Sequence, residues 1–323
     1  MTRRTFVLLF TLAAVLRVLW INVPPLWYDE NFTLILAKLP FEKMMQATMG
    51  DVHPPLWYLI EWGIYHITPG APAWVIRVPA LIFSLASLPL FVMMMRQIGI
   101  SSQVQSAALF LMAVMPFQLW YAQEGRMYAM LEFFVLLALW AGLTRQNVLL
   151  FIGSVGLLYT QNYGPFYLAA IALVIFFRDR SVSFNWSMAA MVSAGVCWLP
   201  WLYVIVGQMQ GINDRYWIVS KSAASLLIIL YKLFLTAAVP SAFFFASYIV
   251  TFAALIIGIV SFVRSHHPGR LTIAIMAFAP LLIAWIVSMV WQPVLLFRPL
   301  IGSSPFLYLV TCWSIGENNV AVS

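Results

Sequence analysis

Long apolar runs recur along almost the whole of this 323-residue chain and restrict the folds that it can adopt. A helix of about 17–25 apolar residues crosses a bilayer while satisfying all of its own backbone polar groups. Hydrophobic residues make up 63% of the chain and charged residues 8%, whereas a soluble domain has roughly 25% charged residues. We therefore expect an all-α polytopic membrane protein that forms a single domain over residues 1–323.

The apolar runs predict about nine complete transmembrane helices and a partial tenth. They lie near residues 6–23, 74–95, 102–120, 127–143, 147–160, 163–177, 186–206, 241–263, 271–291 and 305–316. Two further apolar stretches, 56–68 and 222–238, are short or amphipathic, and Asn31–Met49 has apolar residues at helical spacing. We expect these three segments to be interfacial juxtamembrane helices in the outer loops.

With these three segments at the interface, the basic loop residues fall on one side, which is the cytoplasmic side by the positive-inside rule. They are Arg3, Arg4, Arg96, Arg145, Arg178, Arg180, Arg264 and Arg270. The opposite, outer side receives residues 24–73, the turn at 123–126, the loop 207–240 and the turn 292–304. The outer side is therefore where we expect the functional residues.

The formal net charge of +7 indicates loop anchors and sites for phosphate rather than nucleic-acid binding. No arginine-rich soluble stretch with interleaved aromatic residues supports a nucleic-acid partner. Cys197 and Cys312 both lie in apolar runs, which argues against a disulfide framework or a cysteine metal site. On the outer side, no second histidine stands at ligand spacing from His53, so we expect no metal site.

Acidic residues are scarce, and four of the ten lie on the predicted outer side next to spans: Asp29, Glu30, Asp51 and Glu124. Charge near lipid is costly, so such acids are functional candidates. Asp29, at the outer end of the first helix, suits a general base, or it caps the helix that follows. Glu30 is a second candidate. Asp51 and His53 precede Pro54-Pro55 and either contact a substrate or form a rigid turn.

A second outer motif runs from Gln123 to Tyr128. Glu124, Arg126 and Tyr128 together suit sugar hydroxyls and phosphate, or Glu124 and Arg126 simply pair with each other.

Arg298 stands in the outer turn Phe297-Arg298-Pro299-Leu300. Its planar fork suits the phosphate of a lipid, and the alternative is an arginine that snorkels to the headgroups. Arg77 and Lys221 have the same two interpretations with less support.

Four motifs carry a resemblance to a known family: Tyr28-Asp29-Glu30, Asp51-Val52-His53-Pro54-Pro55-Leu56, Gln123-Glu124-Gly125-Arg126-Met127-Tyr128 and Arg298-Pro299. In this order and spacing, over about residues 1–305, the chain resembles the membrane-embedded glycosyltransferases of the GT-C fold. More narrowly, it resembles the bacterial relatives of protein O-mannosyltransferases and lipid A aminoarabinose transferases (glycosyltransferase family 39-like).

The resemblance implies an inverting glycosyltransferase of the bacterial cytoplasmic (inner) membrane, with its active site facing the periplasm or exterior. It would move a sugar from a polyprenyl-phosphate donor to an acceptor hydroxyl of a glycan, lipid or protein. Membrane lipids are further partners, and the resemblance implies neither a nucleotide sugar nor a cofactor or bound metal.

The resemblance also assigns roles to individual residues. Asp29 matches the catalytic base, and Glu30 beside it is the second catalytic candidate. The substrate-binding candidates are Asp51, His53, Glu124, Arg126, Tyr128 and Arg298.

Two departures from the family bear on activity. Gly125 stands where relatives often have alanine. Relatives continue with further helices, whereas Ser323 follows Arg298 by only 25 residues, so we expect a form shortened at its C-terminus.

Two other interpretations are an inactive truncated relative and a transporter or flippase for a lipid-linked sugar. A transporter should place its ionisable groups near the middle of the membrane, whereas these acids cluster at one edge.

Overall fold

The computed structural model describes residues 1–178, 182–212, 224–235 and 240–316, which contain fifteen α-helices and no strand. The α-helices are α1 (Arg3–Val18), α2 (Tyr28–Lys38), α3 (Phe41–Met49), α4 (Leu56–Ile67), α5 (Val78–Gln97), α6 (Ser102–Val114), α7 (Pro116–Ala122), α8 (Tyr128–Leu143), α9 (Asn147–Thr160), α10 (Gly164–Arg178), α11 (Val182–Ile212), α12 (Ala224–Leu235), α13 (Phe244–Arg264), α14 (Arg270–Val290) and α15 (Ser304–Thr311). Short 3-10 helices are η1 (Ala73–Arg77), η2 (Ser241–Phe243), η3 (Arg298–Ser303) and η4 (Trp313–Ile315).

Four helices of the described part are long and apolar enough to cross a membrane: Ala73–Gln97, Asn185–Gln208, Phe244–Arg264 and Arg270–Val290. The pair α6 and α7 gives a fifth if the two form one bent span. Shorter apolar helices are Tyr128–Leu143, Asn147–Thr160, Gly164–Arg178 and Ser225–Leu235. The all-helical, multi-pass character of the chain is therefore supported, while helix length and composition alone do not give nine complete spans.

Two of the expected helices are broken, both at a proline. The single helix expected over Asn31–Met49 is two helices, α2 and α3, that separate before Pro40. The run expected over 102–120 bends by 55° where α6 gives way to α7 at Pro116. Proline has no N–H to continue the helical ladder and its ring clashes with the preceding turn, so both breaks follow from the residue type.

Arg17 stabilises the break before Pro116. The carbonyl groups of Met112 and Ala113 lie in the last turn of α6, where helical donors end. Arg17, which is fully buried, donates to both of them at 2.8 and 3.0 Å, and its Nε donates to Ser84 Oγ at 2.8 Å. A charged side chain of α1 thus supplies the donors that the bent span lacks.

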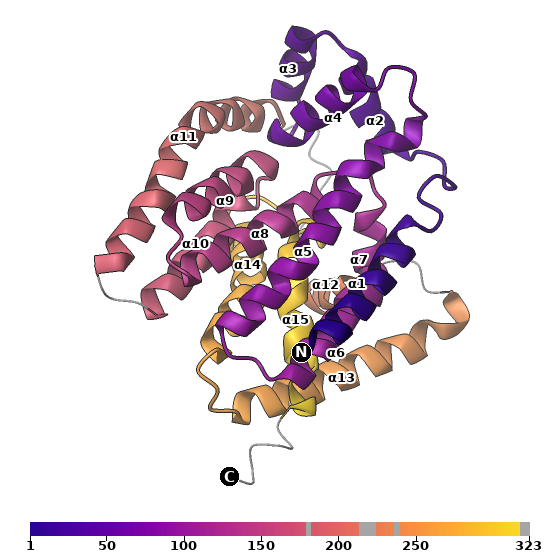
Figure 1. Cartoon of the computed structure of the whole chain (residues 1–323). Coiled ribbons are helices and arrows are strands. Elements are labelled where there is room, and N and C mark those ends of the chain that lie inside the picture. Colours follow the sequence, from indigo (N-terminus) through magenta and orange to yellow (C-terminus); the bar gives the residue numbers. More distant parts are fainter. Residues whose placement is uncertain (179–181, 213–223, 236–239, 317–323) are drawn as a thin grey trace.

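The two ends of the helix bundle differ in composition. We call one the acidic end; it comprises α2, α3, α4, residues 123–127 and η3. The other, the basic end, comprises Met1 and the loops at residues 98–101, 144–146 and 265–269. Figure 1 shows α2, α3 and α4 together at the top, and the N-terminus and the loops that follow α5 and α13 in the lower part. Helix α5, with 20 residues, connects the two ends over about 30 Å.

Hydrogen bonds tie the loops of the basic end together. His267 Nε2 lies 3.1 Å from the Gly99 carbonyl oxygen, Arg178 donates to the carbonyl of Gln97 at 3.3 Å, and Arg96 donates to that of Met1 at 3.5 Å. Basic loop residues that the sequence assigned to one side therefore do gather at one end. Arg180, which belongs to the same set, lies outside the described residues.

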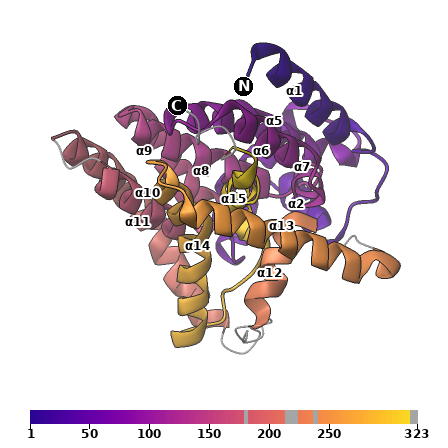
Figure 2. The ribbon, with the colours of Figure 1, turned by 90° about the horizontal axis from the view of Figure 1, so that it is seen from below.

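Helix α15 lies near the middle of the bundle in the view of Figure 2 and packs against α6, α13 and α14. The 3-10 helix η3 leads directly into it. A Cβ atom on Gly302 would lie 2.7 Å from Val135 and 2.9 Å from Tyr167, so η3 packs closely on α8 and α10. The Tyr167 hydroxyl also donates to the Pro299 carbonyl at 2.9 Å. Arg298, the first residue of η3, is therefore fixed to the core of the molecule.

Candidate functional site at the acidic end

Glu30 is a fully engaged, buried carboxylate. Arg77 approaches it with two nitrogens, Nε to Oε1 and Nη2 to Oε2, both at 2.7 Å. The backbone N–H groups of Gly125 and Trp27 donate to the same carboxylate at 2.8 and 3.3 Å. Glu30 is 1% exposed and Arg77 3% exposed. Bidentate pairs of this kind fix geometry strongly, so Glu30 joins α2 to η1 and to the 123–127 turn.

The guanidinium of Arg77 also organises the connection between α1 and α2. Its Nη1 donates to the carbonyl groups of Ile21 and Pro24 at 2.7 and 3.0 Å, and its Nη2 donates to that of Pro25 at 3.2 Å. From sequence alone, Arg77 has less support as a functional residue than Arg298, because an arginine at the end of a span resembles a headgroup anchor. Its burial and its acidic partner identify it instead as a residue that builds the site.

Asp29 and Arg298 form a second ion pair, and this one is partly open. Arg298 Nη1 lies 3.0 Å from Asp29 Oδ2, and the two side chains are 33% and 27% exposed. Consecutive residues of an α-helix point about 100° apart, which explains why Asp29 and its neighbour Glu30 have different surroundings. The N-cap of α2 is Trp27, so Asp29 lies in the first turn and does not cap this helix. The Trp27 ring also packs against Arg298, whose Cζ is 4.7 Å from the ring centroid.

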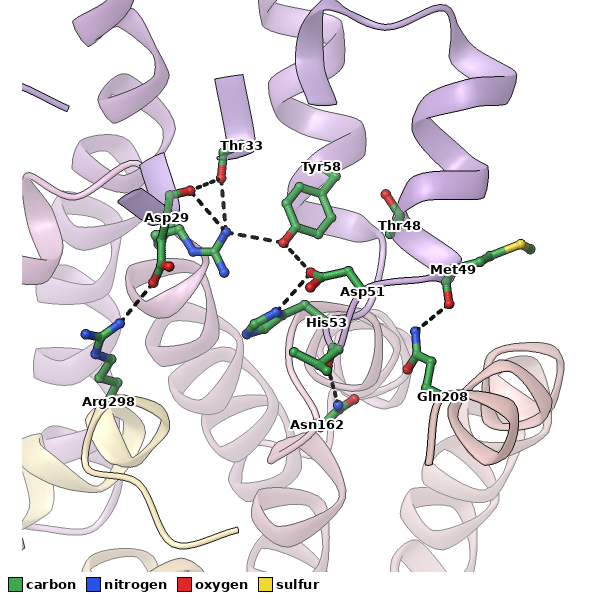
Figure 3. A network of polar contacts seen from close by, with 12 residues as sticks. Asp29, Thr33, Thr48, Met49, Asp51, His53, Tyr58, Asn162, Gln208 and Arg298 are labelled. Carbon is green, nitrogen blue, oxygen red and sulfur yellow. Dashed lines mark hydrogen bonds and ion pairs between the residues drawn. The ribbon is translucent and has the colours of Figure 1, made fainter. Parts of the chain in front are cut away.

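A chain of polar contacts connects this pair to the Asp51 loop (Figure 3). Arg126 Nη1 donates to Thr33 Oγ1 at 3.1 Å and to the Tyr58 hydroxyl at 3.2 Å, and it lies 3.5 Å from the Asp29 carbonyl oxygen. The Tyr58 hydroxyl in turn donates to Asp51 Oδ2 at 2.8 Å, and His53 Nδ1 is 3.2 Å from the same oxygen. Residues from α2, α4 and two loops are thereby joined.

Asp51 is ionised in this environment. Burial opposes its ionisation, but the hydrogen bonds and charge of His53 and the hydrogen bond from Tyr58 outweigh burial and lower the pKa of Asp51 to about 2. Hydrogen bonds to the charged form act in this direction. Beside it, Asn162 donates to the Val52 carbonyl at 2.7 Å, which fastens the Asp51 loop to the α9–α10 connection.

The motif at residues 123–128 contacts each neighbouring element of the site. Gln123 Nε2 donates to the carbonyls of Leu16, Arg17 and Leu19 at 3.1, 2.9 and 2.7 Å, at the end of α1. Tyr128, at the start of α8, packs edge-on against Tyr121 with the ring centroids 4.9 Å apart, and the charge of Arg298 acts on it. Gly125 leaves no room for a side chain, because a Cβ there would lie 2.9 Å from Ile76 Cγ1. An alanine at this position would need Ile76 to move.

Glu124 is the unusual acid of the site. It is 4% exposed, and neither carboxylate oxygen has a hydrogen-bond partner among the described residues. The expected pair with Arg126 is therefore not a hydrogen-bonded one. Burial raises the pKa of Glu124 to about 8, although the positive charges of Arg298 and Arg126 oppose the rise. Glu124 is consequently mostly a neutral acid at pH 7, close to the arginine-paired carboxylates of Glu30 and Asp29.

The structure brings most of the predicted site residues together and adds others. Asp29, Glu124, Arg126, Tyr128 and Arg298 interact with one another, and Asp51 and His53 are connected to them through Tyr58. The sequence did not single out Tyr58, Thr33 or Trp27; Tyr58 could have been found, since it lies one helical turn after the Pro54-Pro55 break. Lys221 lies outside the described residues.

The described residues contain no group of three or more histidine, cysteine or acidic side chains that could hold a metal ion. What they do contain is a partly exposed carboxylate beside a partly exposed arginine, which can respectively take a proton and bind an anion. No family model matches the chain, and no curated protein is significantly similar to it.

Proposed function

We propose that this chain is an inverting glycosyltransferase that moves a sugar from a polyprenyl-phosphate donor to an acceptor hydroxyl. The observation that supports this most is the Asp29–Arg298 pair, which is partly exposed while the neighbouring Glu30–Arg77 pair is buried. A membrane-edge site that combines a proton acceptor with an arginine fork fits an acceptor alcohol and a lipid phosphate.

In the proposed reaction, the acceptor oxygen attacks the anomeric carbon of the lipid-linked sugar. A new glycosidic C–O bond forms, and the bond between that carbon and the phosphate oxygen breaks with its electron pair moving to the phosphate. Asp29 takes the proton of the acceptor hydroxyl. Arg298 stabilises the charge that develops on the departing phosphate. A single displacement of this kind inverts the anomeric configuration.

The ion pair itself supplies a way to couple donor binding to base activation. Arg298 Nη1 donates to Asp29 Oδ2. A lipid phosphate that binds Arg298 competes with Asp29 for the same donor and frees the carboxylate. Glu30, with both oxygens occupied, holds α2 in place in this proposal and does not take the proton.

The proposal is tested by transfer from a panel of polyprenyl-phosphate hexoses and pentoses labelled in the sugar, using purified protein in nanodiscs. Asp29→Asn keeps the size of the side chain but cannot accept the proton, so transfer should fall by about 10²–10⁴-fold. Glu42→Gln, at an exposed acid of α3, is the matched control and should transfer normally. Transfer by Asp29→Asn within a few-fold of wild type would remove Asp29 as the base.

The proposal includes a membrane arrangement. Helices α1, α8, α9 and α10 cross together with the four long helices and the bent α6–α7 pair, which gives nine complete spans. Helix α15 is the partial tenth, α12 lies at the interface, and the acidic end faces the periplasm of a bacterial inner membrane. A cysteine at exposed Gln46, in a background without Cys197 and Cys312, should react with an impermeant thiol reagent in cells with a permeabilised outer barrier. A cysteine at Ser265, in the basic end, should react only after the inner membrane is opened. The reverse pattern would refute this orientation.

A transporter or flippase for a lipid-linked sugar is the second candidate, favoured by one observation. Arg17 and Glu132 are both buried among the helices, and Glu132 Oε1 has no partner in the described part. However, Arg17 donates to the carbonyl groups of Met112 and Ala113 at the end of α6. This contact explains the burial of Arg17 by the structure of the bent span and without a transported substrate. Proteoliposomes discriminate between the two functions, because a transporter moves labelled lipid-linked sugar across the bilayer without cleaving the sugar–phosphate bond.

A further inference from the structure

Asp51 holds the ring of His53 by one nitrogen. Its Oδ2 atom accepts from the Tyr58 hydroxyl and lies 3.2 Å from His53 Nδ1. An ionised carboxylate can only accept hydrogen bonds, so the hydrogen between the two groups resides on Nδ1. In a neutral imidazole the other nitrogen, Nε2, then has a free lone pair.

The free nitrogen lies on the side of the proposed reaction. No hydrogen bond of the described residues engages His53 Nε2, and the side chain is 19% exposed. Figure 3 shows the ring extending from Asp51 on the side that faces Asp29 and Arg298. The charged and titratable groups around it are Asp51 on its own loop, Tyr58 of α4, Arg126 behind Tyr58, and the Asp29–Arg298 pair.

A fixed anion behind one ring nitrogen and a lone pair on the other is the arrangement by which carboxylate–histidine pairs act as proton acceptors. The carboxylate sets the tautomer, orients the ring, and stabilises the imidazolium once it forms. A rigid turn would require Pro54 and Pro55 but would not require a histidine held in this way.

We propose that His53, oriented by Asp51, is a proton carrier that takes at Nε2 the proton that Asp29 receives from the acceptor hydroxyl. This inference rests on the proposed function. Both side chains are partly exposed, so water in the open part of the site carries the proton between them. The O–H bond of protonated Asp29 breaks, an Nε2–H bond forms, and the carboxylate of Asp29 is restored. The imidazolium, stabilised by Asp51, then loses its proton to water at its exposed edge. Asp29 is thereby ready to pair with Arg298 again as the lipid phosphate leaves.

The experiment compares His53→Gln with His53→Ala in the transfer assay, with the labelled polyprenyl-phosphate sugar that wild type uses, with and without free imidazole. Both variants should lose about 10²–10⁴-fold in rate. Imidazole should restore at least tenfold to His53→Ala, where the ring has left a space, and nothing to His53→Gln. His66→Ala, at an exposed histidine near the end of α4, is the matched control and should show neither loss nor rescue.

Transfer by His53→Gln within a few-fold of wild type, or loss in His53→Ala without rescue, would overturn the inference and leave the proposed function standing. Absence of transfer by wild type would count against the proposed function instead. Nitrogen-15 spectra of histidine-labelled protein then decide the inference independently of activity. The signal that disappears in His53→Gln should be that of an imidazole protonated at Nδ1. If the missing signal is that of an imidazole protonated at Nε2, the inference is refuted.

Discussion

The arginines of the basic end and those of the acidic end occupy opposite environments. Arg96 and Arg178 are exposed and donate to backbone carbonyls at 3.3–3.5 Å, whereas Arg77 and Arg126 are each 3% exposed. Exposed arginines at a membrane edge set orientation. Buried arginines require an acid or other acceptors and mark a built site. The arginines of the two ends are the same residue type and lie at similar positions relative to the apolar helices. Only the burial of the side chain and the identity of its partner distinguish a membrane anchor from a residue that builds the site.

The largest effect should come from breaking the buried pair. Arg77→Met leaves Glu30 as an unpaired buried charge and should lower the free energy of unfolding by about 3–5 kcal/mol. The matched change at the basic end, Arg96→Met, should stay within about 0.5 kcal/mol. Denaturant titration in mixed micelles measures the free energy of unfolding of each variant and of wild type.

The double variant Arg77→Met/Glu30→Gln makes the same comparison sharper. It removes both charges and should recover part of the lost stability, because no buried ion is then uncompensated. Equal losses for Arg77→Met and Arg96→Met would show that the two ends do not differ as described.

Arg298 should affect catalysis more than stability. Arg298→Ala should cost on the order of 2–4 kcal/mol of transition-state stabilisation, by analogy with the loss of one preorganised donor. Arg298→Lys keeps the charge without the fork and should lose less. The transfer rate at saturating acceptor is measured for both variants. If Arg298→Ala keeps the wild-type rate but inserts poorly into the membrane, Arg298 is a headgroup anchor like the arginines of the basic end.

Glu124 should make stability depend on pH. Its pKa is raised from 4.5 to about 8, so between these values the folded protein holds a proton that the unfolded chain has lost. Stability therefore falls as the pH rises through this window, by about 1.4 kcal/mol per pH unit. From pH 6 to pH 8 the wild type should lose on the order of 2 kcal/mol, and Glu124→Gln should not. Identical pH profiles of the unfolding free energy would contradict the burial of an unpartnered acid.

The smallest effect should come from the contact that fixes η3. Tyr167→Phe removes the hydrogen bond to the Pro299 carbonyl and should lower the unfolding free energy by about 1 kcal/mol. Tyr203→Phe, at a tyrosine that is 83% exposed, is the control and should be neutral. A loss as large as that of Arg77→Met would indicate that Tyr167 does more than hold the backbone.

The positions of the helices could largely be predicted from the sequence, because apolar runs and their lengths are local properties. The breaks at Pro40 and Pro116 had a local signal too, since proline cannot continue a helix. Neither break was predicted, because the apolar residues continue on both sides of each proline. The capping of α6 by Arg17 could not be predicted, because it depends on how α1 packs beside the bent span.

The candidate site was predictable in its residue types and only partly in its roles. Asp29 and Glu30 are equivalent in the sequence, yet the helical rotation between them turns one toward Arg298 and the other toward Arg77. Those partners lie 269 and 47 residues further along the chain, and nothing local specifies them. The same is true of Glu124: no described residue hydrogen-bonds its carboxylate, while Arg126 donates to Tyr58 and Thr33 instead.

The separation of 269 residues between Asp29 and Arg298 also has a consequence during synthesis. At roughly 5–20 residues per second, the ribosome adds Arg298 some tens of seconds after Asp29 has been delivered to the membrane. Throughout that interval Asp29 is a charge at the bilayer edge without its counter-ion, whereas Glu30 meets Arg77 within about ten seconds. The Glu30–Arg77 contact is therefore available early, and the Asp29–Arg298 pair is completed only when translation reaches η3.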